Sequence, residues 1–179
     1  MNKILRNLTT TTFCLLTFAG IAEAATMGEP GMVLPKLHTI NVNEIEAGNI
    51  AGRRACDPEV RRLGSLISRD HQRLDASLQA VAQDQVVPLG EVFVNEWEQQ
   101  NFRKQEAELK VLRAKRDCTF DIAFLKSMRD GHMFARTVVE EAMNDPASMS
   151  IRQVLTDTAA TIPVHYNGSV ELLEKLNAR

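Results

Sequence analysis

The sequence predicts an all-α protein in which four long helices form one bundle and a further helical segment crosses between the second and the third. Apolar residues recur at three- and four-residue steps through most of the chain, which is typical of helices with one buried face. Strand-like alternation of useful length does not occur. Two cysteines, far apart in the chain, restrict how the helices can be connected.

Residues 1–24 are typical of a cleavable secretory signal. Two basic residues precede an apolar stretch over 13–21, and an Ala-Glu-Ala tripeptide at 22–24 supplies the small-x-small pattern that signal peptidases cut. The apolar stretch is shorter than the ~18 residues that a membrane-spanning helix needs. We therefore expect a mature chain that begins at Ala25, a periplasmic or secreted location, and no transmembrane segment after cleavage.

The residues that remain after cleavage have a normal size for one domain. Segment 25–35 contains two glycines, two prolines and no periodic pattern, so we expect a flexible lead-in there and one helical domain over 36–179. The whole chain has a formal charge of −2. This balance provides no basic field that would attract nucleic acid.

Helix boundaries follow from the apolar stripes and from local signals. Asp57 followed by Pro58 is an N-cap acid with proline at the first helical position. Pro163 falls inside the last helix, where we expect a kink. The predicted helices are about 36–56, 58 to before 88, about 91–116, about 119–143, and from 146–150 to about 176.

Cys56 and Cys118 are both in the mature chain, and an oxidising compartment would join them. Cys56 ends the first helix and Cys118 immediately precedes the helix at 119–143, so a disulfide puts both at one end of the bundle. Segment 91–116 must then return the chain along the bundle, which makes the helices before and after it parallel. Such a long crossover is the connectivity of ferritin-like four-helix bundles.

One ionisable side chain occupies the core-facing stripe of each principal helix: Glu44, His71, His132 and His165. By residue count, Glu44 and His71 lie at matching depth, roughly 18–20 Å from the turn that joins their helices. Buried ionisable groups must be paired, neutralised or bound to an ion, because an unpaired buried charge costs several kcal/mol. A carboxylate and imidazoles in a bundle core are the ligands expected for iron, zinc, manganese or copper.

Two interpretations of these four residues remain open. Ferritin-like two-iron centres use a Glu-x-x-His step on two helices, but Ser68 and Ile162 stand three residues before His71 and His165. The sequence therefore favours a mononuclear metal site, or a satisfied polar layer in which neutral histidines hydrogen-bond Glu44 and one another. No nucleophile with a partnered base and no Gly-rich phosphate loop can be identified, so no reaction is predicted.

Further polar residues flank the stripe. Asp70 and Asp130 are placed to orient the neighbouring histidines from outside the ligand set. Glu46 is a third outer candidate, although its polar face also favours a solvated pair with Arg53. Two ionisable residues are given no role in a site: His38, expected at the surface, and Asp121, whose charge complements the dipole of its helix.

Several short motifs resemble a bacterial family of exported ferritin-like proteins. They are NEIEAGNIAG at 43–52, the Asp70-His71 pair, FDIAFLKSMRDGH at 120–132 and a late proline-histidine step. Members are usually labelled predicted outer-membrane proteins and carry a domain of unknown function. The resemblance spans 36–176 and implies a ferritin-like fold and an extracytoplasmic location, without an established reaction. Carried over by position, the family pattern falls on Glu44, Glu46, Asp70, His71, Phe120, Asp121, Met128 and His132.

These observations predict an exported ferritin-like protein with a buried His/Glu site for a transition metal, used for metal storage, buffering or stress protection. The alternative is a non-enzymatic envelope protein whose polar layer is structural and which acts by binding a protein partner. The sequence does not identify that partner.

Overall fold

The structure, a computed structural model, describes residues 29–90 and 94–178, and this part of the chain contains helices and no strands. The predicted signal segment lies outside the described residues. The helices are α1 (Glu29–Arg54), α2 (Pro58–Asp84), α3 (Glu96–Ala114), α4 (Thr119–Asn144), the short 3-10 helix η1 (Pro146–Ile151) and α5 (Arg152–Asn177).

Helix α1 begins earlier than the sequence predicts. Residues 29–35, expected to belong to a flexible lead-in, are helical, and Pro35 lies inside the helix. A proline in a helix interior costs about 3 kcal/mol. Val33, Leu34 and Leu37 are buried beside it, and each buried side chain of this size contributes about 1.5–3 kcal/mol. Tertiary burial therefore outweighs the local glycine and proline signals.

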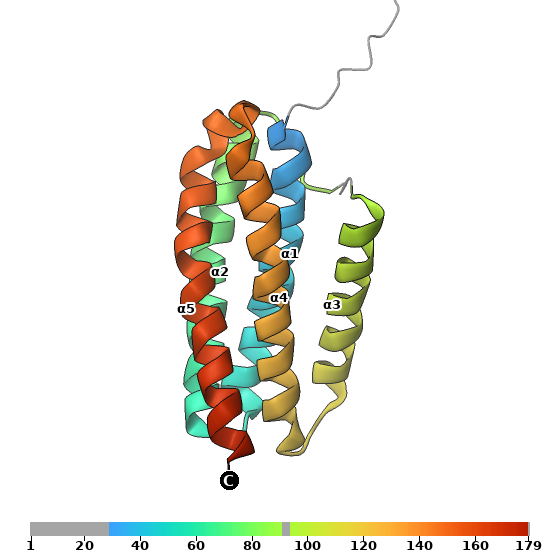
Figure 1. Ribbon diagram of the computed structural model, residues 1–179, viewed down its shortest axis with the longest axis vertical. Helices are drawn as coiled ribbons and strands as arrows, with labels where there is room; N and C mark the ends of the chain where they lie inside the picture. Colours follow the sequence, from blue (N-terminus) through green and yellow to red (C-terminus); the bar gives the residue numbers. More distant parts are fainter. Residues whose placement is uncertain (1–28, 91–93, 179) are drawn as a thin grey trace, which may run out of the picture.

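Four helices form a ring, and α3 lies outside it (Figure 1). Within the ring α1 packs mainly on α2 and α4 mainly on α5, while α2 with α5 and α1 with α4 make the smaller contacts. Helix α3 lies against α1 and α4. In Figure 1, α2 and α4 run in the same direction and α3 returns the chain between them, which is the direction that the cysteine positions predict.

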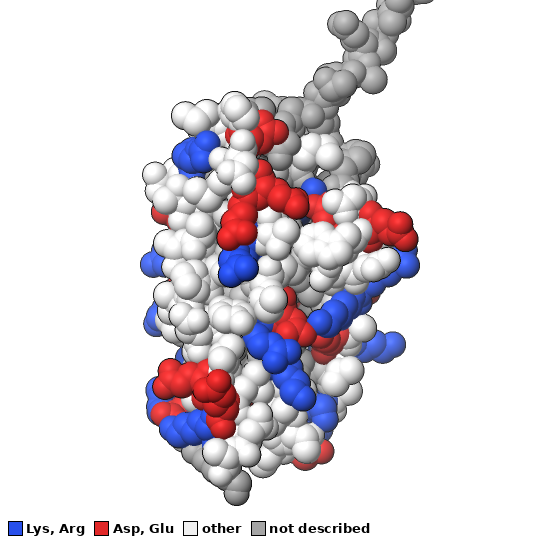
Figure 2. Space-filling view, viewed as in Figure 1, with Lys and Arg blue, Asp and Glu red and all other residues white. Residues whose placement is uncertain are grey.

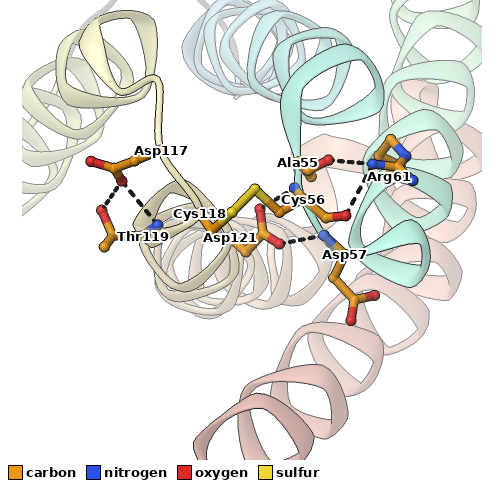
Figure 3. Close-up of a disulfide and its surroundings, with 8 residues drawn as sticks. All are labelled: Ala55, Cys56, Asp57, Arg61, Asp117, Cys118, Thr119 and Asp121. Atoms are coloured by element: carbon orange, nitrogen blue, oxygen red, sulfur yellow. Dashed lines mark hydrogen bonds between the residues drawn. A yellow bond between two sulfur atoms is a disulfide. The ribbon is translucent and has the colours of Figure 1, made fainter.

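The disulfide between Cys56 and Cys118 joins the start of α2 to the start of α4 (Figure 3). The buried carboxylate of Asp121 accepts hydrogen bonds from the backbone N–H groups of Cys56 (2.9 Å) and Asp57 (2.7 Å). Asp121 therefore fixes the corner between two helices, whereas the sequence suggested only an interaction with the dipole of its own helix. As predicted, the Asp57 side chain caps α2, accepting from the N–H of Glu59.

Helices α1 and α2 approach backbone to backbone. A Cβ placed on Gly64 would lie 2.5 Å from the Cβ of Ala51, and one on Gly48 would lie 2.6 Å from the carbonyl oxygen of Gly64. No side chain fits at either distance, so the glycines permit the contact. Gly48 is one turn after Glu44. The close approach therefore sets the spacing of α1 and α2 next to this buried carboxyl group.

The buried core has two apolar halves. One contains Leu34, Leu78 and Phe134 among its members, and the other contains Ile67, Phe120 and Phe124. Buried polar side chains lie between these halves along the helices, and we call them the polar layer: Asn41, Glu44, His71, Asp75, His132 and His165. Buried polar groups require partners, so this layer is where chemistry is expected.

Acidic and basic side chains are interspersed on the face shown in Figure 2. This mixture agrees with the small net charge of the whole chain, −2. Among the described residues, none of the helices has the length and apolarity required to cross a membrane.

Candidate metal centre

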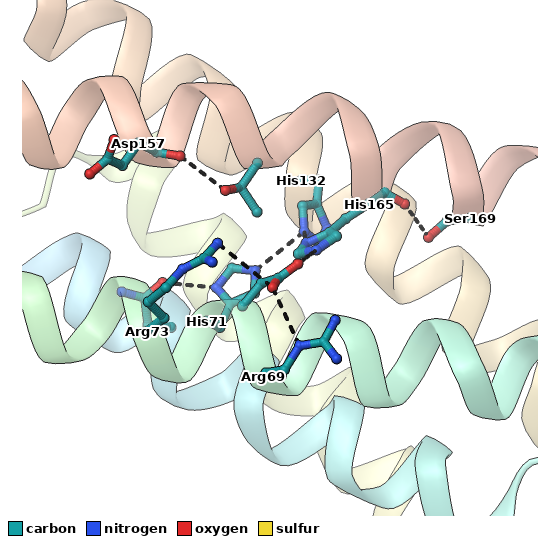
Figure 4. A network of polar contacts seen from close by, with 10 residues as sticks. Arg69, His71, Arg73, His132, Asp157, His165 and Ser169 are labelled. Atoms are coloured by element: carbon teal, nitrogen blue, oxygen red, sulfur yellow. Dashed lines mark hydrogen bonds and ion pairs between the residues drawn. The ribbon is translucent and has the colours of Figure 1, made fainter.

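Three of the four core-stripe residues meet in the polar layer. His71 on α2, His132 on α4 and His165 on α5 gather between their helices (Figure 4), and each is at most 4% exposed. His132 Nε2 lies 3.5 Å from His71 Nε2 and 3.1 Å from His165 Nδ1. One ring nitrogen from each histidine lies within 4.8 Å of the other two. We call these three residues the histidine triad.

The outer nitrogen of each ring is held by a different acceptor. His71 Nδ1 donates to Asn41 Oδ1 (2.8 Å), His132 Nδ1 donates to the carbonyl oxygen of Met128 (2.7 Å), and His165 Nε2 donates to a carboxylate oxygen of Asp70 (3.2 Å). A carbonyl or carboxylate oxygen only accepts, so each outer nitrogen carries the proton. The orientation of the Asn41 amide follows because its Nδ2 donates to the Asp75 carboxylate.

The protons on the outer nitrogens leave three lone pairs facing one another. Burial lowers the pKa of His71 well below its usual value, and the two neighbouring histidines lower it further. Burial and the nearby His165 lower the pKa of His132 to about 3. Burial also lowers the pKa of His165, although the hydrogen bond to Asp70 opposes this shift. All three rings are therefore neutral at pH 7, which is the form that binds metals.

The spacing of the inner nitrogens matches a metal coordination sphere. Zinc–imidazole bonds of 2.0–2.1 Å in a tetrahedron place neighbouring nitrogens about 3.3 Å apart. The two N···N distances of 3.5 and 3.1 Å lie on either side of that value. An outer acceptor on each ring is also the usual arrangement around metal-binding histidines. The third pair, His71 Nε2 and His165 Nδ1, lies within 4.8 Å, so the triad can hold one transition metal ion, and three protein ligands leave a fourth tetrahedral position open.

Glu44 does not join the inner nitrogens, contrary to the ligand set expected from the sequence. Its Oε1 lies 3.8 Å from His132 Nδ1, the outer nitrogen that donates to Met128. Glu44 is nevertheless buried, at 4% exposure. Burial, and secondly the charge of Glu108, raise the pKa of the Glu44 carboxyl to about 8. Glu44 therefore belongs to the polar layer, but its carboxyl group lies on the outer side of the His132 ring.

Of the three residues expected to lie outside the ligand set, only Asp70 contacts a histidine of the triad among the described residues. Asp70 orients His165 rather than its sequence neighbour His71. Asp130 pairs with Lys104 and Arg129 on the surface side, and Glu46 pairs with Arg113 instead of the expected Arg53. Asp130 and Glu46 thus have partners away from the triad, because both project from the outer parts of their helices toward α3 or solvent.

Sequence reasoning missed a polar chain that starts at His71. Asn41 accepts from His71 and donates to Asp75 (3.5 Å), and Asp75 lies 2.7 Å from His38 Nδ1. His38 is therefore part of the polar network and not simply a surface residue. A usable signal existed, because Asn41 precedes Glu44 by three residues and Asp75 follows His71 by four, which are steps along one helix face.

Comparisons with known proteins agree with the all-helical fold. Residues 18–172 match the sequence profile of a family described as "Domain of unknown function (DUF4142)". The chain belongs to this family. Among solved structures, a DUF305 fragment from Deinococcus radiodurans has a similar fold, with a TM-score of 0.72 and 14% sequence identity over 83% of this chain and 97% of that chain. A search of curated proteins found no match.

Proposed function

We propose that the protein binds one divalent transition metal ion through His71 Nε2, His132 Nε2 and His165 Nδ1. The observation that supports this proposal is the convergence of three neutral imidazole lone pairs whose outer nitrogens are already engaged. A cation among them satisfies all three lone pairs at once. Neutral nitrogen ligands favour zinc or copper over manganese at such a site.

The same geometry supports metal buffering as the role of this site. A single three-histidine centre takes up one ion per chain, which suits reversible buffering better than storage of many ions. The open coordination position allows an exchanging ligand to deliver or remove the metal. The crossover of α3 between parallel helices α2 and α4 further supports assigning the ring to the ferritin-like bundles, whose metal sites also lie in the bundle core.

Metal titration of the untagged, metal-free protein tests this function. We expect one Zn²⁺ or Co²⁺ per chain by calorimetry and elemental analysis, and no stoichiometric binding after His71→Ala, His132→Ala or His165→Ala. His38→Ala is the matched control, because this fourth histidine contacts Asp75 and not the triad. A parent protein that binds no metal, or a His132→Ala variant that binds as the parent does, would contradict the proposal.

A purely structural polar layer predicts a different result. In that case added metal does not change the stability of the parent, and His71→Leu costs about 1–3 kcal/mol because the buried Asn41 Oδ1 loses its donor. For a metal site, added metal at a hundredfold excess over Kd stabilises the parent by about 2.7 kcal/mol and leaves the variant unchanged. Thermal unfolding with and without Zn²⁺ separates the two roles.

We further propose that the protein is exported and processed before Ala25. The tripeptide at 22–24 motivates this proposal, and the Cys56–Cys118 disulfide supports it, because such bonds persist in oxidising compartments. N-terminal sequencing of protein recovered from the periplasm or medium should return Ala25 as the first residue. Recovery of intact Met1 from the cell envelope would overturn the proposed processing.

A further inference from the structure

Glu44 has a buried oxygen that no described residue satisfies. Its Oε2 is inaccessible and has no hydrogen-bond partner among the described residues. Leaving a buried polar atom without a partner costs about 1–3 kcal/mol, and more for a charged group. In native structures such an atom usually marks a bound water or ion. The histidine triad does not explain it, because Glu44 lies on the outer side of the His132 ring.

The backbone of α4 makes room for this carboxylate. A Cβ placed on Gly131 would lie 2.7 Å from Glu44 Oε1, so any larger residue at this position would displace the Glu44 side chain. The lack of a side chain at Gly131 allows the buried carboxylate to lie directly against the helix.

A second carboxylate lies one turn away on the same face of α4. Glu108 of α3 accepts a hydrogen bond from Ser127 Oγ (2.9 Å). Ser127 and Gly131 are four residues apart, so the two carboxylates contact adjacent turns, about 6 Å apart along the helix. Gln105, on the same face of α3 as Glu108, also has a buried Nε2 with no hydrogen-bond partner in the part of the chain that the structure describes.

We propose that Glu44 and Glu108 bind a second divalent cation between α1, α3 and α4, outside the four-helix ring. Carboxylate and hydroxyl oxygens are the ligands of hard cations such as Mn²⁺, Mg²⁺ and Ca²⁺. Metal–oxygen bonds of about 2.3–2.6 Å let one ion join oxygens up to roughly 5 Å apart. Side-chain rotation that closes the remaining distance brings both carboxyl groups to one ion, which displaces the proton of Glu44 and supplies the missing partner of its Oε2.

Lys104 is the competing cation in this region. Its Nζ lies 2.7 Å from Asp130 but 3.7 Å from Glu108, and its side chain is half exposed. Asp130 is therefore the main partner of Lys104, and the amine does not reach the unsatisfied oxygen of Glu44. We expect Lys104→Gln to strengthen cation binding, because it removes a positive charge from the edge of the site.

Manganese binding to protein preloaded with Zn²⁺ tests this second site. Zinc occupies nitrogen ligands in preference to manganese, and free Mn²⁺ can be counted by electron paramagnetic resonance. We expect one Mn²⁺ per chain in the parent and loss of this binding in Glu44→Gln and Glu108→Gln, with zinc retained. Gly131→Ala should weaken Mn²⁺ binding because it displaces Glu44. Glu140→Gln, which changes an exposed carboxylate paired with Arg136, is the matched control.

Each result of the Mn²⁺ experiment either supports or overturns the second site. No Mn²⁺ binding by the zinc-loaded parent overturns the second site. Equal Mn²⁺ binding by the parent and Glu108→Gln also overturns it. Glu108 is partly exposed, so this variant remains informative if Glu44→Gln does not fold. Zinc content of the same samples reports on the triad separately, which distinguishes failure of one site from failure of the other.

Discussion

At the scale of single residues, the three histidines differ in the acceptor that holds each outer nitrogen. His71 has an amide oxygen, His132 a backbone carbonyl and His165 a carboxylate. A carboxylate acceptor increases the basicity of a ligating imidazole more than a neutral acceptor does. Asp70, the acceptor of His165, is the charged one of the three acceptors. Replacing it with a neutral residue therefore changes the charge beside the triad.

Replacing Asp70 with Ala should weaken metal binding without removing a ligand. Loss of an outer acceptor typically lowers metal affinity about 10- to 100-fold, and we expect this range for Zn²⁺ measured by competition with a chromophoric chelator. Asp130→Ala is the control, because Asp130 bonds Lys104 and Arg129 instead. Equal affinities in the two variants would show that Asp70 does not support the site.

The metal-free protein should be most stable near pH 6.5. The folded pKa values of the triad lie below the usual 6.5, so the unfolded state binds more protons below this pH and stability falls on acidification. The folded pKa of Glu44 is raised from 4.5 to about 8, so its contribution is full below pH 4.5 and is lost as the pH rises toward 8. Each fully active group changes stability by about 1.4 kcal/mol per pH unit.

Urea unfolding of the metal-free protein at several pH values measures this profile. Just below pH 6.5 the lowered pKa values of three histidines oppose the raised pKa of one glutamate, so the histidines determine the slope. Glu44→Gln should flatten the alkaline side and steepen the acidic side above pH 4.5, because the contribution that opposes the histidines is removed. A stability that rises steadily from pH 6.5 to 8 in the parent would contradict the assignment to Glu44.

At the scale of elements, the contact of α1 with α2 is the tightest feature of the ring. It places Asn41 of α1 against His71 of α2, and it depends on residues without side chains at Gly48 and Gly64. Helix α3, by contrast, lies against the outside of α1 and α4. One face of α1 therefore sets the spacing of the helices that hold the triad. The other face lies toward α3, which contains Glu108.

Gly64→Ala should destabilise the protein even though alanine favours helices. The helix propensity gain is about 1 kcal/mol, but the new Cβ would lie 2.5 Å from the Cβ of Ala51. Overpacking of this kind costs about 1–3 kcal/mol, so we expect a net loss by chemical denaturation. Gly90→Ala is the control, because no atom of the described residues lies within 4 Å of a Cβ there. A more stable Gly64→Ala variant would show that the helices separate readily.

At the scale of the whole molecule, the disulfide and Asp121 join two helix starts that are distant in sequence. The bond closes a separation of 62 residues and includes α2, α3 and their connection. Two of the three triad helices, α2 and α4, therefore begin at one fixed corner. Their parallel direction then places His71 and His132 at similar depth in the bundle.

Removing the disulfide should lower the stability of the folded protein by roughly 4 kcal/mol, because the open chain gains the entropy of a loop of this length when it unfolds. Denaturation of the parent and of a variant with both Cys56→Ala and Cys118→Ala measures the difference. Asp121 and the apolar core remain in the variant, so we expect it to fold and retain one Zn²⁺ per chain. Equal stability of the two proteins would contradict a constraint by the loop.

Much of this architecture was accessible from particular residues. Asp57-Pro58 marked the start of α2, and the histidines in apolar stripes marked the polar layer. The beginning of α1 was not accessible, because burial around Pro35 outweighs the local signals. Asn41 and Asp75 were overlooked because polar residues on a helix face are common, and only a facing partner shows which ones are buried.

The sequence by itself determined the course of the helices apart from the start of α1, which pair of cysteines could be joined, and that Glu44, His71, His132 and His165 enter the core. These properties depend on the periodicity and spacing of residues along the chain. Only the tertiary structure decided which nitrogen of each histidine faces the centre and that Glu44 lies on the other side of His132. Ring orientation depends on helix rotation and on acceptors from other helices, and these contacts exist only once the bundle has packed.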